Sequence, residues 1–174
     1  MIEATLCFPM RRAETGEPDG TEPTEVLLIE KRRGLGEGWY NGPGGKLEGD
    51  ETPRECAVRE TREEVGLEIE PAALEAAGEL TFLLDGETHT VCHVFRTESF
   101  EGEPRSSSEA RPEWFGVDEV PYDQMWEDDR LWLPGVLEGK IVVGEFAFEG
   151  GEPLDEAEFV AHDLEWDVSI PSKR

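Results

Sequence analysis

The chain has 174 residues, of which 42 are acidic and 16 basic, giving a formal net charge of −26 at pH 7. This length suits one domain with a sizeable core, and the five Trp and eight Phe can bury enough apolar area to exclude a disordered chain. A protein so acidic, without a basic patch, is not expected to bind nucleic acid, and no apolar run of about 18 residues predicts a membrane span.

The acidic residues are spread along the chain instead of forming one block. Self-repulsion of this size destabilises a compact state unless salt screens it, and at 1 M salt the Debye length falls to about 3 Å. The composition therefore predicts a protein of a salt-rich cytoplasm, as in a halophile. An acidic scaffold for basic partners is the alternative, although no concentrated acidic block favours it.

The three cysteines, Cys7, Cys56 and Cys92, are odd in number, widely spaced and without a Cys-x-x-Cys pair. This pattern predicts reduced thiols in a cytoplasmic protein and argues against a disulfide framework or a zinc site. The N-terminal segment has no basic region ahead of its apolar residues, so a signal peptide is not expected.

The first predicted elements follow from hydrophobic patterning. Residues 2–8 alternate apolar and other side chains and predict a strand, and the apolar run at 26–31 predicts a buried strand. Between them, residues 13–25 are polar and punctuated by Gly and Pro, which predicts a loop. Residues 32–51 form a long glycine-rich loop, and its Trp39–Tyr40 pair favours a functional role.

A helix is predicted directly after this loop. Thr52 can cap it, Pro53 suits the first helical position, and Glu55 completes a capping box. The helix should end near Val65, because Gly66 is a typical C-terminal stop.

The rest of the chain predicts more strands than helices. Further strands are expected at residues 79–84, 89–98, 112–117, 140–150 and 157–162, with a helix near 128–137. If the strand at 89–98 alternates regularly, His89 and His93 face the same side, and we assign neither a role. The prediction is an α/β (α+β) fold, a mixed sheet with helices packed on it, in one domain over 1–174. Residues 1–165 form its core and residues 166–174 a tail.

The helix after the glycine-rich loop separates into faces when its residues are placed about 100° apart. Its predicted core face consists of Ala57, Val58, Thr61 and Val65. Glu60, Glu63 and Glu64 share a second arc, where like charges at these spacings cost a few tenths of a kcal/mol per pair. Carboxylate oxygens on one face suit Mg²⁺ or Mn²⁺, whereas the alternative is a solvated acidic face.

The preceding loop favours the metal site. The glycine-rich stretch "NGPGG" at 41–45 can bring backbone groups close to a ligand beside the acidic helix. Together, loop and helix match the Nudix box, G-x5-E-x7-R-E-U-x-E-E-x-G-U, in which U is apolar. Its fixed positions are filled by Gly45, Glu51, Arg59, Glu60, Glu63, Glu64 and Gly66. The one departure is Thr61, at a position where a larger aliphatic residue is usual.

The chain therefore resembles the Nudix hydrolases, and the resemblance implies an α/β/α sandwich with a mixed sheet. It implies that Glu60, Glu63 and Glu64 bind a divalent cation, with one of them acting as general base. The carbonyl of Gly45 is implied as a further ligand. Arg59 and Glu51 are implied as the pair that orients the helix glutamates.

A second informative stretch, "QMWEDDRLWLP", begins at residue 124. One interpretation of this stretch is purely structural: a Trp in the core followed by the start of a helix, with Asp128 as its cap. The functional interpretation is that Trp126 stacks on a base beside two carboxyls, Asp128 and Asp129, that read its hydrogen-bonding edge.

From Lys31 to Gly150 the chain is similar to the Nudix branch that hydrolyses oxidised purine nucleoside triphosphates, the 8-oxo-dGTP diphosphatases or MutT homologues. The resemblance implies substrate binding by Asn41, Phe82, Trp126, Asp128 and Asp129. It also implies Glu109 as a metal ligand from outside the box. Leu35 departs from this branch, which has a pocket phenylalanine there, and so indicates a roomier pocket.

The expected function is Mg²⁺-dependent hydrolysis of oxidised purine nucleoside triphosphates to the monophosphate and pyrophosphate, as a monomer in the cytoplasm. The catalytic residues implied are Glu60, Glu63, Arg59 and Glu51. One alternative keeps the class but changes the substrate to dinucleoside polyphosphates, nucleotide sugars or ordinary triphosphates. Another is a nucleotide-binding regulator without turnover.

Overall fold

The structure is a computed structural model that describes residues 1–13, 24–33 and 37–171. Most of the expected loop at 13–25, the pocket position Leu35, and residues 172–174 of the expected tail lie outside the described residues. Within the described ranges, no helix is long and apolar enough to cross a membrane.

The described residues form a mixed sheet flanked by α1 (Pro53–Val65) and α2 (Asp129–Leu137). The strands are β1 (Ile2–Arg11), β2 (Glu25–Lys31), β3 (Tyr40–Asn41), β4 (Gly44–Lys46), β5 (Glu75–Leu84), β6 (Glu87–Thr97), β7 (Ala110–Gly116), β8 (Val142–Glu149) and β9 (Glu158–Trp166). Short 3₁₀ turns are η1 (Pro71–Ala73), η2 (Tyr122–Gln124) and η3 (Leu154–Glu156).

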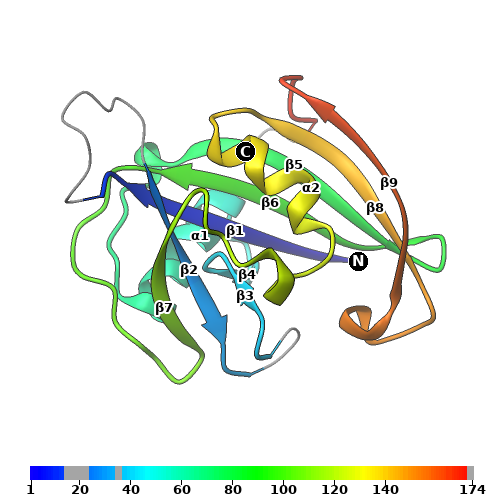
Figure 1. Ribbon diagram of the computed structural model, residues 1–174, viewed down its shortest axis with the longest axis horizontal. Coiled ribbons are helices and arrows are strands. Elements are labelled where there is room, and N and C mark those ends of the chain that lie inside the picture. Colours follow the sequence, from blue (N-terminus) through cyan, green and yellow to red (C-terminus); the bar gives the residue numbers. More distant parts are fainter. Residues whose placement is uncertain (14–23, 34–36, 172–174) are drawn as a thin grey trace.

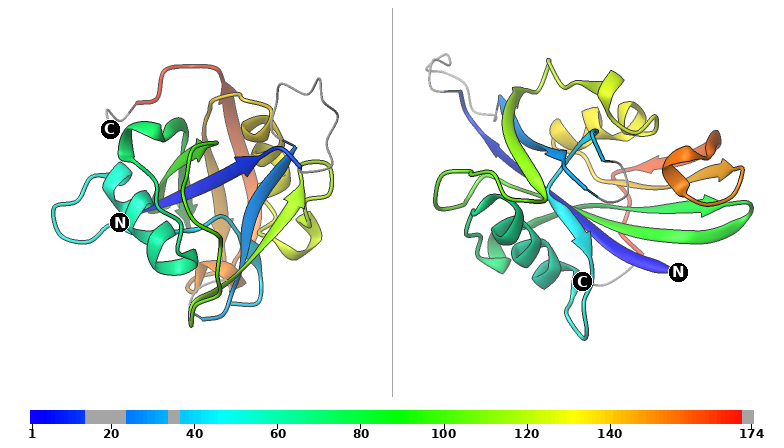
Figure 2. Two further views of the ribbon diagram at one scale, coloured as in Figure 1. Left: turned by 90° about the vertical axis from the view of Figure 1, so that its left-hand side faces the viewer. Right: turned by 90° about the horizontal axis from the view of Figure 1, so that it is seen from below.

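The strands run in the order β3-β2-β1-β6-β5-β8-β9, with β4 paired to β1 and β7 paired to β2. The pairs β1·β6 and β5·β8 are parallel and the others antiparallel, which makes the sheet mixed as expected. Figure 1 shows α2 in front of the strands and α1 behind them, and Figure 2 shows the two helices on opposite sides of the sheet. The α/β/α arrangement follows from this placement.

Neighbouring residues on the central strands supply the cores on the two faces of the sheet. Phe8 packs in a cluster with Trp132 of α2, whereas Cys7 packs in another with Ala57 of α1. Successive side chains of a strand point to opposite faces, so β1 serves both layers at once. Both helices are therefore fixed against the same central strand.

The helix α1 begins and ends where its sequence predicts. The Glu55 N–H donates to Thr52 Oγ1 at 3.2 Å, and the Thr52 N–H donates to Glu55 Oε1 at 2.8 Å, which completes the capping box. Gly66 takes φ 78°, a left-handed conformation that suits glycine at a helix C-terminus. Thr61 is accommodated in the core because its hydroxyl donates to the Ala57 carbonyl at 2.7 Å.

Two expectations were wrong. Residues 40–41 and 44–46, expected in a loop, form β3 and β4, because the loop crosses beside β2 and β1. Regular alternation also fails in β6, because Phe82 pairs with Thr90 while Leu83 pairs with Thr88, which leaves His89 as an extra residue in a β-bulge.

Candidate functional site

A carboxylate cluster lies where α1 meets the start of β7. Glu60 and Glu64 come from α1, and Glu109 immediately precedes β7. One oxygen from each of these carboxylates lies within 4.8 Å of the other two, and this is the one group of three such possible ligands found among the described residues. Hard oxygen donors in this arrangement are what Mg²⁺ and Mn²⁺ prefer.

Strand β4 brings backbone groups against this cluster. The Gly44 N–H donates to Glu64 Oε1 at 2.8 Å. A Cβ at Gly45 would lie 2.6 Å from the carboxyl carbon of Glu60, so glycine lets the backbone come this close without displacing that carboxyl group. The glycine-rich stretch therefore packs on the acidic face of α1, where the Gly45 carbonyl accepts a hydrogen bond from Cys56 Sγ at 3.5 Å, one turn before Glu60.

Burial makes the cluster unfavourable without a cation. Glu64 is 4% exposed, and burial raises its pKa from 4.5 to about 8, although the Gly44 N–H lowers it. Burial also raises the pKa of Glu60, against the effect of the Arg59 guanidinium. A bound divalent cation would favour the ionised carboxylates and offset these shifts, so the residues present fit such an ion.

Arg59 holds the acidic residues around the cluster. Its guanidinium lies 2.6 Å from Glu51 Oε1, 2.7 Å from Glu60 Oε1 and 3.0 Å from Glu63 Oε2. Its hydrogen bond to Glu51 holds the pKa of that carboxyl at about 2. Arg59 and Glu51, predicted as an orienting pair, are thus in contact, and the same guanidinium contacts Glu60 and Glu63.

Glu63 lies differently from the other predicted ligands. Its side chain is 52% exposed and paired with Arg59, and it is not part of the group formed by Glu60, Glu64 and Glu109. Glu109 instead pairs with Arg33 at 2.9 Å. The structure thus brings two of the three predicted helix glutamates together with the residue predicted from outside the box.

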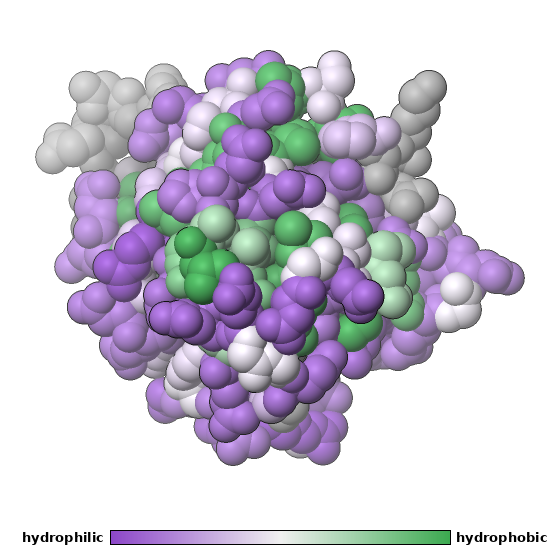
Figure 3. Space-filling view, turned by 90° about the vertical axis from the view of Figure 1, so that its right-hand side faces the viewer, coloured by the Kyte–Doolittle hydropathy of each residue, from purple (hydrophilic) through white to green (hydrophobic). Residues whose placement is uncertain are grey.

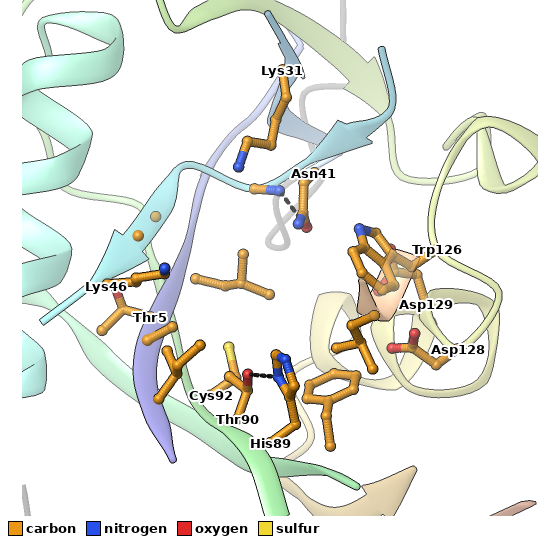
Figure 4. A pocket seen from close by; sticks show the side chains of 18 of the residues that line it. Thr5, Lys31, Asn41, Lys46, His89, Thr90, Cys92, Trp126, Asp128 and Asp129 are labelled. Carbon is orange, nitrogen blue, oxygen red and sulfur yellow. Dashed lines mark hydrogen bonds between the residues drawn. The ribbon is translucent and has the colours of Figure 1, made fainter. Parts of the chain in front are cut away.

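A cavity of about 350 Å³ lies beside this cluster. It is lined by all the residues predicted to bind substrate: Asn41, Phe82, Trp126, Asp128 and Asp129. Gly44 and Gly45 line it as well, so the cavity reaches the backbone that packs on Glu60 and Glu64. Figure 4 shows Trp126, Asp128 and Asp129 on one side of the cavity, with Lys46 and Thr5 on the other.

Asp128 and Asp129 are almost completely buried, at 1% and 3% exposure. Asp128 does not cap α2 with its side chain, because its Oδ2 accepts a hydrogen bond from Trp132 Nε1 at 2.9 Å. Asp128 Oδ1 and Asp129 Oδ2 have no hydrogen-bond partner among the described residues. Buried polar atoms of this kind need a partner, and in a cavity a ligand can supply it.

The two carboxyls cannot easily ionise together. Burial raises the pKa of both, and the neighbouring Asp128 raises the pKa of Asp129 further. We infer that one carboxyl stays protonated near neutral pH, because two buried negative charges in contact repel each other. The pair then offers one hydrogen-bond donor and several acceptors to a base.

Aromatic contacts fix the walls of the cavity. Trp126 packs edge-on against Trp39, with ring centroids 5.3 Å apart, and Phe82 stacks on Phe146 at 5.5 Å. Asn41 Oδ1 accepts a hydrogen bond from the Gly42 N–H at 2.9 Å, which leaves its amide N–H groups for a ligand (Figure 4). Figure 3 shows hydrophobic side chains gathered near the centre of an otherwise hydrophilic face.

Sequence reasoning missed several lining residues. They include Ile2, Thr5, Lys31, His89, Thr90, Cys92, Glu152 and Leu154. These residues come from distant parts of the chain and share no motif, so their convergence depends on sheet topology and on the bulge in β6.

Comparison with known proteins gives consistent matches. Residues 11–136 match the NUDIX domain. The chain is 43% identical to an oxidized purine nucleoside triphosphate hydrolase of Danio rerio, covering 78% of this chain and 86% of the relative. It is 38% identical to the protein of that name from Mus musculus, covering 76% of this chain and 85% of the relative.

A similar fold occurs in a solved structure, that of the mutator MutT protein from Bacillus halodurans. The TM-score is 0.75 at 25% sequence identity, and the match covers 95% of this chain and 98% of that one.

Proposed function

Since this chain belongs to the NUDIX domain family of hydrolases, we propose that it hydrolyses oxidised purine nucleoside triphosphates to the monophosphate and pyrophosphate. Such a reaction removes damaged nucleotides from the pool. One observation carries the proposal: buried oxygens of Asp128 and Asp129, without a hydrogen-bond partner among the described residues, belong to a cavity whose lining includes Gly44 and Gly45, which pack on Glu64 and Glu60.

The base is proposed to bind at the Asp128–Asp129 end, against Trp126 and Phe82. A protonated carboxyl can donate to a base oxygen while its ionised neighbour accepts from an N–H. If the proton can sit on either residue, one pocket can satisfy both 8-oxoguanine and 2-oxoadenine edges. Asn41 would contribute its amide donors to the same base.

The triphosphate is proposed to lie at the other end, where Glu60, Glu64 and Glu109 would hold Mg²⁺ or Mn²⁺ together with the Gly45 carbonyl. Glu63 is the remaining proposed ligand. The cation would supply Lewis-acid stabilisation of the charge on the phosphoryl oxygens, which a protein of net charge −26 otherwise repels.

The residues of the chain itself orient the reaction. Arg59 holds Glu60 and Glu63 in place through ion pairs of 2.7 and 3.0 Å, and Glu51 fixes the other side of its guanidinium. We propose that Glu60, a partly exposed member of the cluster, or Glu63, the half-exposed carboxylate beside it, accepts the proton of the attacking water.

A substrate panel tests the proposal. The purified protein, assayed with Mg²⁺ or Mn²⁺ at low and molar salt, should release pyrophosphate from 8-oxo-dGTP and 2-oxo-dATP faster than from dGTP and dATP. Preference for dinucleoside polyphosphates, nucleotide sugars or ordinary triphosphates would refute the proposed substrate but keep the reaction class. Tight nucleotide binding without turnover at any salt would indicate a regulator.

The proposal includes a cellular setting. The enzyme would act in the cytoplasm of a salt-adapted organism, as a monomer whose partner is a small nucleotide. One domain over 1–174, with its core at 1–165 and a tail at 166–174, remains the proposed organisation. The acidic surface and the three free cysteines support the setting.

A further inference from the structure

The β-bulge in β6 places His89 in the cavity. Thr90 and Cys92 line the cavity, so regular alternation would turn His89 to the opposite face with His93, which pairs there with Glu3 at 3.0 Å. As the extra residue of the bulge, His89 lines the cavity instead, and its Nδ1 lies 2.7 Å from Thr90 Oγ1. Bulges beside active sites commonly redirect one side chain in this way.

The partner of His89 comes from the β8–β9 connection, beyond the residues that match the family. His89 Nε2 lies 3.3 Å from Glu152 Oε1, and Glu152 also lines the cavity. Asp85, in the turn between β5 and β6, accepts hydrogen bonds from the Gly150 and Gly151 N–H groups at 3.0 and 2.9 Å. The connection is therefore fixed to the turn just before His89, which sets the position of Glu152.

The His89–Glu152 pair has little value as a stabilising contact. The Glu152 side chain is 73% exposed, and even a full ion pair at such an exposed site contributes only about 0 to 1 kcal/mol. The pair nevertheless places a carboxylate acceptor at the cavity wall, while the contacts of both ring nitrogens, to Thr90 and to Glu152, hold the His89 ring beside it. A strand irregularity and a fixed loop both serve to place it there.

The place of this pair in the cavity indicates the part of the substrate that it meets. In Figure 4 His89 lies between the side that carries Lys46 and the side that carries Asp128 and Asp129. With the base at the Asp128–Asp129 end and the phosphates at the carboxylate cluster, the sugar joins the two ends. A sugar 2′-hydroxyl both donates and accepts hydrogen bonds, and carboxylates are common partners for it.

We propose that Glu152, positioned by His89 and Asp85, binds the 2′-hydroxyl of the substrate and thereby sets the preference of this chain between oxidised purine ribonucleotides and deoxyribonucleotides. The inference rests on the proposed function and adds the sugar to it. Glu152 is thus a specificity-determining residue and His89 a positioning residue.

The test compares 8-oxo-GTP with 8-oxo-dGTP as substrates of the wild type, Glu152→Gln and His89→Gln. Gln keeps an acceptor oxygen but loses the charge that strengthens the hydrogen bond. The ratio of kcat/KM, ribonucleotide over deoxyribonucleotide, should therefore fall about fivefold in Glu152→Gln. His89→Gln should lower it less, because Glu152 remains. The matched control is Glu156→Gln, the same charge change at an exposed position of the same connection, which should leave the ratio at the wild-type value.

The outcomes separate the two proposals. Hydrolysis of both nucleotides with an unchanged ratio in Glu152→Gln would refute the sugar contact and leave the proposed function standing. An equal fall in kcat/KM for both nucleotides would also refute it. Such a fall would show an effect on folding or on a contact that both sugars make, for example to the 3′-hydroxyl. Absence of hydrolysis of either nucleotide by the wild type would refute the proposed function and this inference with it.

Discussion

Replacing Glu64 by Gln should stabilise the metal-free protein by an amount that grows with pH. The substitution keeps the shape of the side chain and an oxygen to accept the Gly44 N–H, but removes the buried charge. The pKa of Glu64 is raised from 4.5 to about 8, chiefly by burial. At about 1.36 kcal/mol per pKa unit, this difference corresponds to roughly 5 kcal/mol once the carboxylate is fully ionised.

The direction follows from proton binding. A carboxyl whose pKa is raised in the folded state holds its proton there after the unfolded chain has released it. Its contribution to stability is fully present below pH 4.5 and is lost as pH rises through about 8. The advantage of Glu64→Gln in free energy of unfolding should therefore be near zero at pH 4, about 3 kcal/mol at pH 7 and about 5 kcal/mol above pH 9.

Urea unfolding at constant salt, from pH 4 to 10 in EDTA, measures this difference. Glu63→Gln is the matched control, because Glu63 lies on the same helix with a half-exposed side chain, and its effect should stay within about 1 kcal/mol. Saturating Mg²⁺ should stabilise the wild type by about 3 kcal/mol at 100 times its Kd and stabilise Glu64→Gln much less. A pH-independent difference between Glu64→Gln and wild type in EDTA would refute the reasoning.

Three further predictions concern the surrounding residues. Arg59→Lys should lower kcat about 100-fold in a pyrophosphate-release assay, because Lys cannot hold Glu51 and the helix glutamates together. Wild-type activity of this variant would contradict the orienting role. Asp129→Asn should change the ratio of kcat/KM for 8-oxo-dGTP and 2-oxo-dATP about tenfold, and unchanged activity on every oxidised purine would exclude proton sharing in the pair. Arg96→Met should lower the free energy of unfolding, measured by urea denaturation, by about 3 kcal/mol. The reason is that buried Arg96 donates to carbonyl oxygens at the C-terminal end of α2 and just beyond it. A loss below about 1 kcal/mol would mean that these hydrogen bonds stabilise the fold little.

The parts of the fold that the sequence predicts well are those fixed by local chemistry. The bounds of α1 follow from Thr52, Glu55 and Gly66, whose hydrogen bonds and backbone conformation involve residues within a few positions. In contrast, β3 and β4 contain two and three residues, mostly without the side chains that mark strands. They form because β2 and β1 offer pairing partners that are remote in sequence.

The candidate site divides in the same way. Glu60 and Glu64 are neighbours on one turn of a helix, so spacing alone predicts that their carboxylates approach each other. Spacing along the sequence does not predict that Glu109 lies near these two residues, because β7 is positioned by pairing with β2, which is remote in sequence. Only the resemblance to the family indicated this contact. His89 was assigned no role, and its place in the cavity depends on a single register shift that alternation cannot reveal.

Burial marks some of the functional acids in a chain with so many carboxylates, although half-exposed ones such as Glu63 and Glu109 escape it. Among the described residues, four acidic side chains are buried: Glu64, Glu79, Asp128 and Asp129. Glu79 faces His93, whereas the other three lie at the two ends of the proposed substrate site. Burying a carboxylate costs free energy of folding. The buried carboxylates at the two ends of the proposed site are therefore explained if they bind a ligand there, a cation at Glu64 and a base at Asp128 and Asp129. Exposed acids carry no such penalty in high salt, which is why counting charges along the sequence could not distinguish the two kinds.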